Sequence, residues 1–320
     1  MLNNSKLPEI SKQIYTQDTL NVLTDSYQSI APIWSSHQME WMCNIYSSFK
    51  DHDKFMILIY LTKKTLSFYS RNLVKLTYDE FYSKDKVEIE KFNISDLSKF
   101  LGIPKETTRR KINELENTQV IKRDKSKIIL DRSTFRHIKP ISSIKRISRF
   151  LSIFSKVICN EKILPKEFSS AQLEKTIIDN FSHIWKIYYD VQIPMLVGYK
   201  KIFKDLETFH IWGTCVNNSF QNSSKSKIKK KKLEFINTLS DDDNQGINAM
   251  SISDITGIPR ATVVRKLKKL IKSKYLIIDK NKHYKLNGNL TKKLIPVQYD
   301  VLKQLAIFST TIYNLTIYSS

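Results

Sequence analysis

Arg110 and Arg265 occupy matching positions in two segments of the chain that lie 155 residues apart. Thr107 and Thr262 stand three residues before them in each segment. An arginine side chain offers several N–H donors in one plane, which can bind a phosphate group or the edge of a guanine base through two hydrogen bonds. The repeated pattern therefore favours binding to a polyanion through matched guanidinium and hydroxyl groups.

The two arginines belong to an internal repeat. Residues 102–127 and 257–282 are identical at 10 of 26 positions without a gap, and each segment begins with Gly-Ile-Pro. Further matches join residues 25–57 to 179–211 and residues 151–155 to 305–309. A repeat of this length reports on the architecture of the whole chain. We therefore predict two similar domains, residues 1–160 and 161–320, which meet near residues 159–170.

Each repeat predicts two helices around a glycine turn, at about 94–117 and about 249–272. Gly102 ends the first helix because glycine tolerates a positive φ, and Pro104 begins the second because a first-turn residue needs no N–H. Gly257 and Pro259 take the same places in the second copy. The apolar positions of the first helix are Ile94, Leu97, Phe100 and Leu101 in one copy and Ile252 and Ile255 in the other.

The second helix of each pair has one apolar face. Thr108, Ile112 and Leu115 share that face in the first copy, which places Arg110 at the centre of the opposite face. The candidate contacts to nucleic acid are Lys105, Thr107, Arg109, Arg110 and Asn113 in the first copy, and Arg260, Thr262, Arg265, Lys268 and Lys269 in the second. An ordinary solvated helix face is the alternative interpretation.

A basic hairpin follows each second helix. Residues 120–131 and 275–287 each contain two short β-prone runs around Asp-Lys-Ser-Lys or Asp-Lys-Asn-Lys. Lysines at such a tip can reach the backbone or the minor groove of a duplex. The candidate residues are Lys125, Lys127, Lys280 and Lys282, and an exposed turn that happens to carry lysines is the alternative.

The composition indicates a basic, mainly α-helical protein. The formal net charge is +22, which favours nucleic acid or a membrane surface as partner, although an AT-rich genome would also raise the lysine content. Only 6 glycines occur, which disfavours an all-β fold with many tight turns. Cys43, Cys159 and Cys215 lie far apart and are expected to be free thiols. Neither a signal peptide nor a membrane span is evident, so we expect a cytoplasmic protein that does not enter a membrane.

Motifs of catalytic or cofactor sites are missing from the sequence. It contains no GxxxxGK or GxGxxG loop, no HExxH and no cluster of cysteine and histidine. Asp241 to Asp243 could bind Mg²⁺, but a solvated turn over residues 241–246 is the more ordinary interpretation. We therefore expect no enzyme activity, no cofactor and no metal.

Aromatic helices flank each repeat, and a long helix closes it. The closing helices are predicted at about 141–158 and about 296–317. Residues 217–232 are predicted to form a flexible lysine-rich loop. The aromatic residues favour a core between the two halves, and an effector pocket is the second interpretation. They are Trp34, Trp41, Tyr46, Phe49, Trp185, Tyr188, Tyr199, Phe203 and Trp212.

The two motifs resemble the winged helix-turn-helix regulators, and the MarR-like branch most. The resemblance rests on ISDLSKFLGIPKETTRRKINEL with VIKRDKSKIIL, and on SISDITGIPRATVVRKLKKL with YLIIDKNKHYKL. MarR-like proteins are homodimers whose terminal helices form the interface. The resemblance implies that this chain is such a dimer fused into one polypeptide, with a pseudo-two-fold axis and room for a small-molecule effector. Further dimerisation is left open.

These observations together predict a tandem winged helix-turn-helix protein that binds double-stranded DNA and regulates transcription. The two outward faces differ in sequence. Glu106, Arg109 and Asn113 of the first copy align with Ala261, Val264 and Lys268 of the second. We therefore expect an asymmetric DNA site made of two half-sites. A plasmid-type replication initiator with two winged-helix domains is the first alternative. A protein-interaction scaffold whose helix-turn-helix motifs no longer bind DNA is the second.

Overall fold

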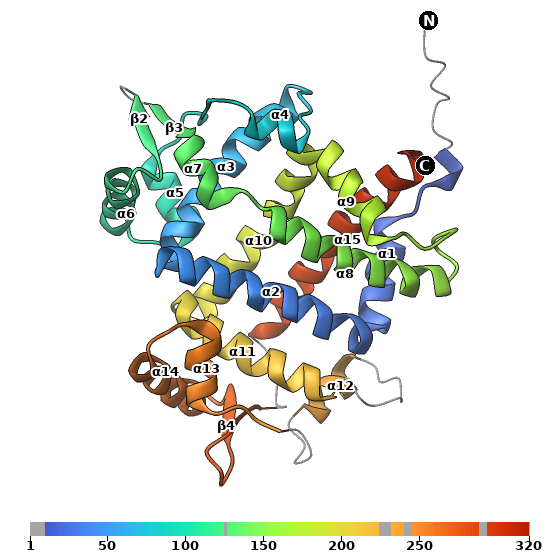
Figure 1. The fold of residues 1–320 in the computed structure, drawn as a ribbon. Helices are drawn as coiled ribbons and strands as arrows, with labels where there is room; N and C mark the ends of the chain where they lie inside the picture. Colours follow the sequence, from blue (N-terminus) through green and yellow to red (C-terminus); the bar gives the residue numbers. More distant parts are fainter. Residues whose placement is uncertain (1–9, 125–126, 224–231, 240–244, 288–292, 320) are drawn as a thin grey trace, which may run out of the picture.

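The fold is mainly helical, with few and short antiparallel strands (Figure 1). The computed structural model describes residues 10–124, 127–223, 232–239, 245–287 and 293–319. A short 3₁₀ turn at Ile10–Lys12 comes first. The elements that follow it are α1 (Thr16–Asp25), α2 (Tyr27–Phe49), α3 (His52–Arg71), α4 (Tyr78–Tyr82), β1 (Lys86–Glu88), α5 (Ile94–Leu101), α6 (Lys105–Asn117), β2 (Lys122–Asp124), β3 (Lys127–Asp131), α7 (Arg132–Ile138) and α8 (Ile141–Asn160).

A second run of elements repeats much of this order. Its members are α9 (Ser170–Asp179), α10 (Phe181–Phe203), α11 (Leu206–Ser223), α12 (Lys232–Thr238), α13 (Ala249–Thr256), α14 (Arg260–Lys272), β4 (Leu276–Ile278), β5 (Tyr284–Leu286) and α15 (Leu294–Ser319). Helices α2 and α10 have 23 residues each, and α6 and α14 have 13 residues each. Both α2 and α10 stop at a lysine in the left-handed conformation, Lys50 and Lys204.

The helices of the two runs pack across each other. Helix α1 contacts α15, and α8 contacts α9, so the first and last helices of each run meet those of the other. Helix α2 likewise packs on α11, and α3 packs on α10. Helices α2, α8, α10 and α15 thus cross the middle of the molecule (Figure 1). One hydrophobic core extends through both runs.

The aromatic helices supply that core, as the sequence predicts. Trp185 and Tyr188 are fully buried, with ring centroids 4.5 Å apart, and Trp34 and Phe49 are partly buried against the core. The other predicted aromatics are buried as well: Trp41, Tyr46, Tyr199, Phe203 and Trp212. Burial of aromatic rings from both runs stabilises their association, because each ring removes a large apolar area from water.

Both predicted hairpins form, and each gains a partner that the sequence does not predict. Strand β3 pairs with β2 and also with β1, which gives a three-stranded antiparallel sheet in the order β1-β3-β2. In the second run β4 pairs with β5, and Ile247 forms a single antiparallel bridge with Tyr284 of β5. A strand of three residues is too short to show a period, so its pairing is decided by the tertiary fold.

One predicted segment and two predicted apolar positions differ from the structure. The predicted loop at 217–232 is wrong over residues 217–223, which form the end of α11. The amides of that segment find tertiary partners, because Asn218 and Asn222 both donate to the carbonyl of Gln245. Phe100, one of the apolar positions predicted for its helix, is 44% exposed, and its ring centroid lies 5.5 Å from that of Tyr60. Ile255 on the matching helix is 51% exposed.

Other predicted segments agree within a few residues or lie outside the described residues. The closing helices run slightly beyond their predicted ends, as α8 and α15 show. Asp241 to Asp243 fall outside the described part of the chain. The three cysteines are free. In the described residues, no helix combines the length and the hydropathy needed to span a membrane.

Candidate nucleic-acid interface

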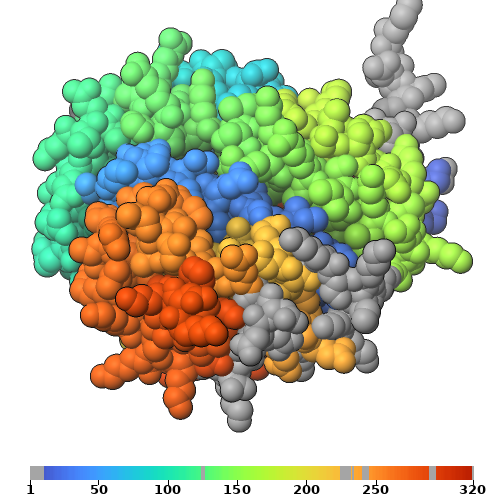
Figure 2. Space-filling view, turned by 60° about the horizontal axis from the view of Figure 1, so that its bottom comes forward, coloured from blue at the N-terminus to red at the C-terminus, as the bar shows by residue number. Residues whose placement is uncertain are grey.

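The repeated motifs form two similar units on one side of the molecule. We call residues 86–131 the first unit and residues 247–287 the second unit. Their second helices, α6 and α14, lie along the same edge of the ribbon, at the left of Figure 1, with the hairpins pointing outward at its two ends. In Figure 2 the surfaces of the two units, in green and in orange, are again neighbours on the left side. Both units can therefore face one extended partner.

The turn inside each unit has the same local structure. Gly102 and Gly257 end α5 and α13 with φ of 60° and 67°, in the left-handed region that favours glycine. A serine hydroxyl then donates to the carbonyl of the residue after each glycine, at 2.6 Å from Ser98 and 2.8 Å from Ser253. The two turns therefore share the same hydrogen bond as well as the same glycine conformation.

The outward faces of α6 and α14 carry the predicted site residues. Thr107 and Thr262 are half-buried at the edges of these faces. Lys125 lies outside the described residues. The remaining candidates are exposed: Lys105, Arg109, Arg110, Asn113 and Lys127 in the first unit, and Arg260, Arg265, Lys268, Lys269, Lys280 and Lys282 in the second. The predicted inward residues are buried: Thr108, Ile112 and Leu115, and Val263, Leu267 and Leu270.

An ion pair between a buried lysine and a partly exposed aspartate ties each of these helices to the helical core. Lys111 on α6 donates to Asp51, which also caps the N-terminus of α3. Lys266 on α14 donates to Asp205 over 2.6 Å and has Glu207 at 3.4 Å. The two lysines are identical residues of the repeat, and so are the two aspartates. This identity is a signal in the sequence that could have pointed to the ion pairs. Sequence reasoning assigned them no role, because lysine on an inward face is unusual.

The charge of these lysines governs the titration of their partners. Burial by itself would raise the pKa of Asp51 and of Asp205. The hydrogen bond and the positive charge of the lysine oppose burial, and the pKa of each carboxyl ends below its ordinary value. Both carboxyl groups are therefore ionised at neutral pH.

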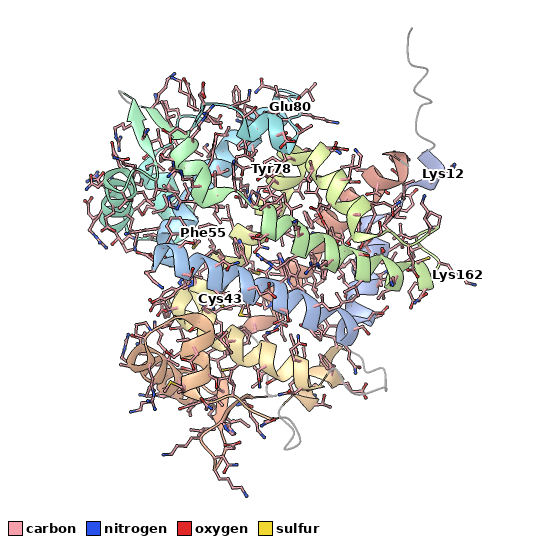
Figure 3. All side chains as sticks on the ribbon, viewed as in Figure 1. Lys12, Cys43, Phe55, Tyr78, Glu80 and Lys162 are labelled. Carbon is pink, nitrogen blue, oxygen red and sulfur yellow. The ribbon has the colours of Figure 1, made fainter. Side chains whose placement is uncertain are left out.

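Two histidines lie between the halves, beside these ion pairs. The rings of His52 on α3 and His210 on α11 are 5.3 Å apart and nearly perpendicular. Cys43 on α2 lies 3.4 Å from Nε2 of His210 and donates to the carbonyl of Ile255 on α13 (Figure 3). Burial lowers the pKa of His52 to about 4 and that of His210 to about 3. The nearby Asp51 and Asp205 carboxylates raise the pKa of His52 again, but less than burial lowers it.

We expect the protein to lose stability in mild acid because of this histidine pair. Both imidazoles are neutral in the fold and take up a proton near their ordinary pKa of 6.5 when the chain unfolds. The unfolded state therefore binds more protons as the pH falls from 6.5 to about 4, and the free energy of unfolding drops by up to about 1.4 kcal/mol per pH unit for each histidine. Urea denaturation at several pH values measures this slope.

The double variant H52F/H210F tests the assignment. It should flatten the slope between pH 6.5 and 4, with only the contribution of other histidines left, such as that of buried His37. An unchanged slope would show that the two histidines have the same pKa in the fold as in the unfolded chain.

A cavity of about 110 Å³ opens between α1, α2, α10, α11 and α15. Its walls are mostly apolar, and none of the described residues that line it is charged. The amide group of Gln38 and the indole N–H of Trp212 lie in these walls without a hydrogen-bond partner, at 4% and 5% exposure. A bound molecule could supply the missing hydrogen bonds.

Comparison of the chain with protein-family models, with curated proteins and with solved structures gives no match.

Proposed function

We propose that the protein is a sequence-specific double-stranded DNA-binding regulator of transcription, built from two winged helix-turn-helix units that resemble MarR-like regulators. The observation that carries the proposal is the pair of matched helices on one edge of the molecule. Arg110 and Arg265 stand exposed at the same position of α6 and α14. A second helix after a glycine turn is the element that enters the major groove in helix-turn-helix proteins.

The packing between the two runs supports a fused pseudo-dimer. The contacts are reciprocal, because α1 on α15 matches α9 on α8, and α2 on α11 matches α10 on α3. A pseudo-two-fold axis between residues 1–160 and 161–320 would produce this reciprocity. Two half-sites about one helical turn apart, or a multiple of it, would fit such an arrangement. The differing outward residues favour an asymmetric site, and recovery of only symmetric sites from a random duplex pool would exclude it.

Replacing Arg110 and Arg265 together by alanine should weaken specific duplex binding by about 100-fold or more. Each arginine that reads a base edge contributes about 1–3 kcal/mol of discrimination. Mobility-shift titration against the selected duplex measures the loss. Arg149→Ala is the matched control, since that arginine is exposed on α8, outside both units. Equal affinity of R110A/R265A and the wild type would contradict the proposal and favour the scaffold alternative.

Mapping the bound sites in the genome separates regulation of transcription from initiation of replication. Sites at promoters support the regulator. An array of repeated sites at an origin would favour the plasmid-type initiator instead.

We further propose that the cavity beside Gln38 binds a small neutral effector. The apolar walls and the unpartnered amide fit a small aromatic molecule with one polar group, and a cavity of similar size holds benzene in another protein. A carboxylate is disfavoured, because no lining residue would neutralise its charge. Indole or benzamide should raise the melting temperature, and benzoate should not. A stabilisation by benzoate alone would contradict this ligand class.

A further inference from the structure

The two units carry very different charges on their second helices. Helix α6 has four basic and three acidic residues, whereas α14 has six basic residues and no acidic one. One lysine of each helix is buried against the core, Lys111 and Lys266. The surface that α6 presents is therefore close to neutral, whereas the surface of α14 is strongly positive.

The arginines of the first unit are held by carboxylates of the same helix. Arg109 bonds to Glu106 at 2.9 Å, and Arg110 bonds to Glu114. Glu114 also pairs with Lys54 of α3 at 2.7 Å, so it is fixed from two sides. The hydrogen bonds and charges of both cations lower the pKa of Glu114. A DNA phosphate that approaches Arg110 must compete with this carboxylate.

The positive charges on the hairpin of the first unit are also neutralised by nearby carboxylates. Lys127 lies 3.0 Å from Glu88 of β1, and Lys122 pairs with Asp131 at the end of β3. Arg123 faces Glu116 of α6 at 3.3 Å. Lys122, Arg123 and Lys127, the basic groups of this wing that the structure describes, therefore each have a carboxylate beside them.

In the described part of the chain, the exposed cations on the second helix and at the hairpin tip of the second unit lack these restraints. Ala261 and Lys269 replace Glu106 and Glu114 of the first unit, and Ile271 replaces Glu116. Among the described residues, no carboxylate lies within ion-pair distance of the exposed cations of α14: Arg260, Arg265, Lys268, Lys269 and Lys272. The same holds for Lys280 and Lys282 on its hairpin. These exposed lysine and arginine side chains are available to bind phosphates.

We infer that DNA binding is divided between the two units. The second unit, the electrostatic anchor, supplies affinity for any sequence, and the first unit, the selective reader, supplies the preference for one sequence. The inference rests on the proposed function. Free cations that meet phosphates release condensed counterions, which gives affinity for any sequence. A helix that presents Glu106 in the major groove repels phosphates and accepts a hydrogen bond from an amino group such as N4 of cytosine. The first half-site should therefore carry a cytosine amine where Glu106 lies, and the second half-site should be less constrained.

Duplex affinity as a function of salt concentration tests the division. The anchor variant K268A/K269A/K272A should reduce the slope of log K against log salt by about 2.7, since each phosphate contact contributes about 0.9. The matched reader variant K105A/R109A/R110A also removes three exposed cations, and it should change the slope by less than about 1. It should instead reduce the ratio of specific to nonspecific affinity. Equal changes of slope in the two variants would overturn the inference.

A charge-relief variant provides an independent readout. E106Q/E114Q keeps the size of both side chains and removes the carboxylates that hold Arg109 and Arg110. It should raise affinity for random duplex by several-fold and weaken the preference at the first half-site. Unchanged affinity and preference would overturn the assignment of the reader.

Failure of the proposed function has a different signature. In that case the wild type shows no salt-dependent duplex binding at all. Wild-type binding with equal slopes for the two triple variants would leave the function standing and exclude only the division.

Discussion

Replacing Asp51 by alanine is expected to destabilise the protein by about 2–4 kcal/mol, because it leaves a buried lysine without its partner and removes a helix cap. Asp51 is the ion-pair partner of Lys111, whose side chain is only 9% exposed. The variant leaves that ammonium group buried without its carboxylate. It also removes the cap of α3, because Asp51 accepts from the backbone of Asp53 and Lys54. Urea denaturation gives the free energy of unfolding.

Asp205→Ala is the matched control for this prediction. Asp205 bonds to Lys266 and to the backbone N–H of Thr208, so it plays the same two parts in the second half. The loss should be smaller, because Lys266 keeps Glu207 at 3.4 Å after the substitution. Asp205 is also more exposed than Asp51, at 43% against 26%. If D51A loses less stability than D205A, the carboxylates are not what holds the two lysines in place.

Replacing Trp185 by alanine is expected to lose about 3–5 kcal/mol of stability and to enlarge the cavity that Trp185 lines with Tyr188 and Tyr189, so that it also binds an aromatic ligand. Trp185 is 2% exposed and stacks on Tyr188. Its position corresponds to Ala31, 154 residues earlier, and Ala31 lines the cavity beside Gln38. Tyr189 likewise replaces Ser35 of the cavity wall. Trp185 and Tyr189 line another cavity at the corresponding place, and their large side chains occupy space that Ala31 and Ser35 leave open.

Calorimetric titration with indole measures the second part of this prediction. The W185A variant should bind one more indole than the wild type, and indole should restore part of the lost stability. Ala31→Trp is the reciprocal variant, since a large side chain there should occupy the existing cavity and abolish indole binding. Loss of stability in W185A without any gain in binding would show that the core collapses around the vacated space.

Local signals were enough to predict the two units. A glycine with positive φ, a proline at a helix start and an apolar face of period 3.6 act over a few residues, so they can be recognised in the chain itself. Gly102 and Gly257 end their helices as predicted, and Thr108 and Val263 face inward as predicted. The mainly helical fold and the aromatic core follow from signals of the same kind.

Pairings between distant residues could not be predicted in this way. The strand β1 and the bridge at Ile247 depend on the position of a hairpin far along the chain. The polar end of α11 is helical because its amides reach the carbonyl of Gln245. Composition alone assigned that segment to a loop, since the tertiary partners of Asn218 and Asn222 are invisible in the sequence.

The sequence by itself thus determined the repeat, the glycine turns and the outward placement of Arg110 and Arg265. Only the tertiary structure decided which charges are free. It brought Asp51 to Lys111, and it fixed Glu114 between Arg110 and Lys54. The reason is physical. A helical period places a side chain on a face, whereas its burial and its ionic partner depend on what the rest of the chain packs against that face.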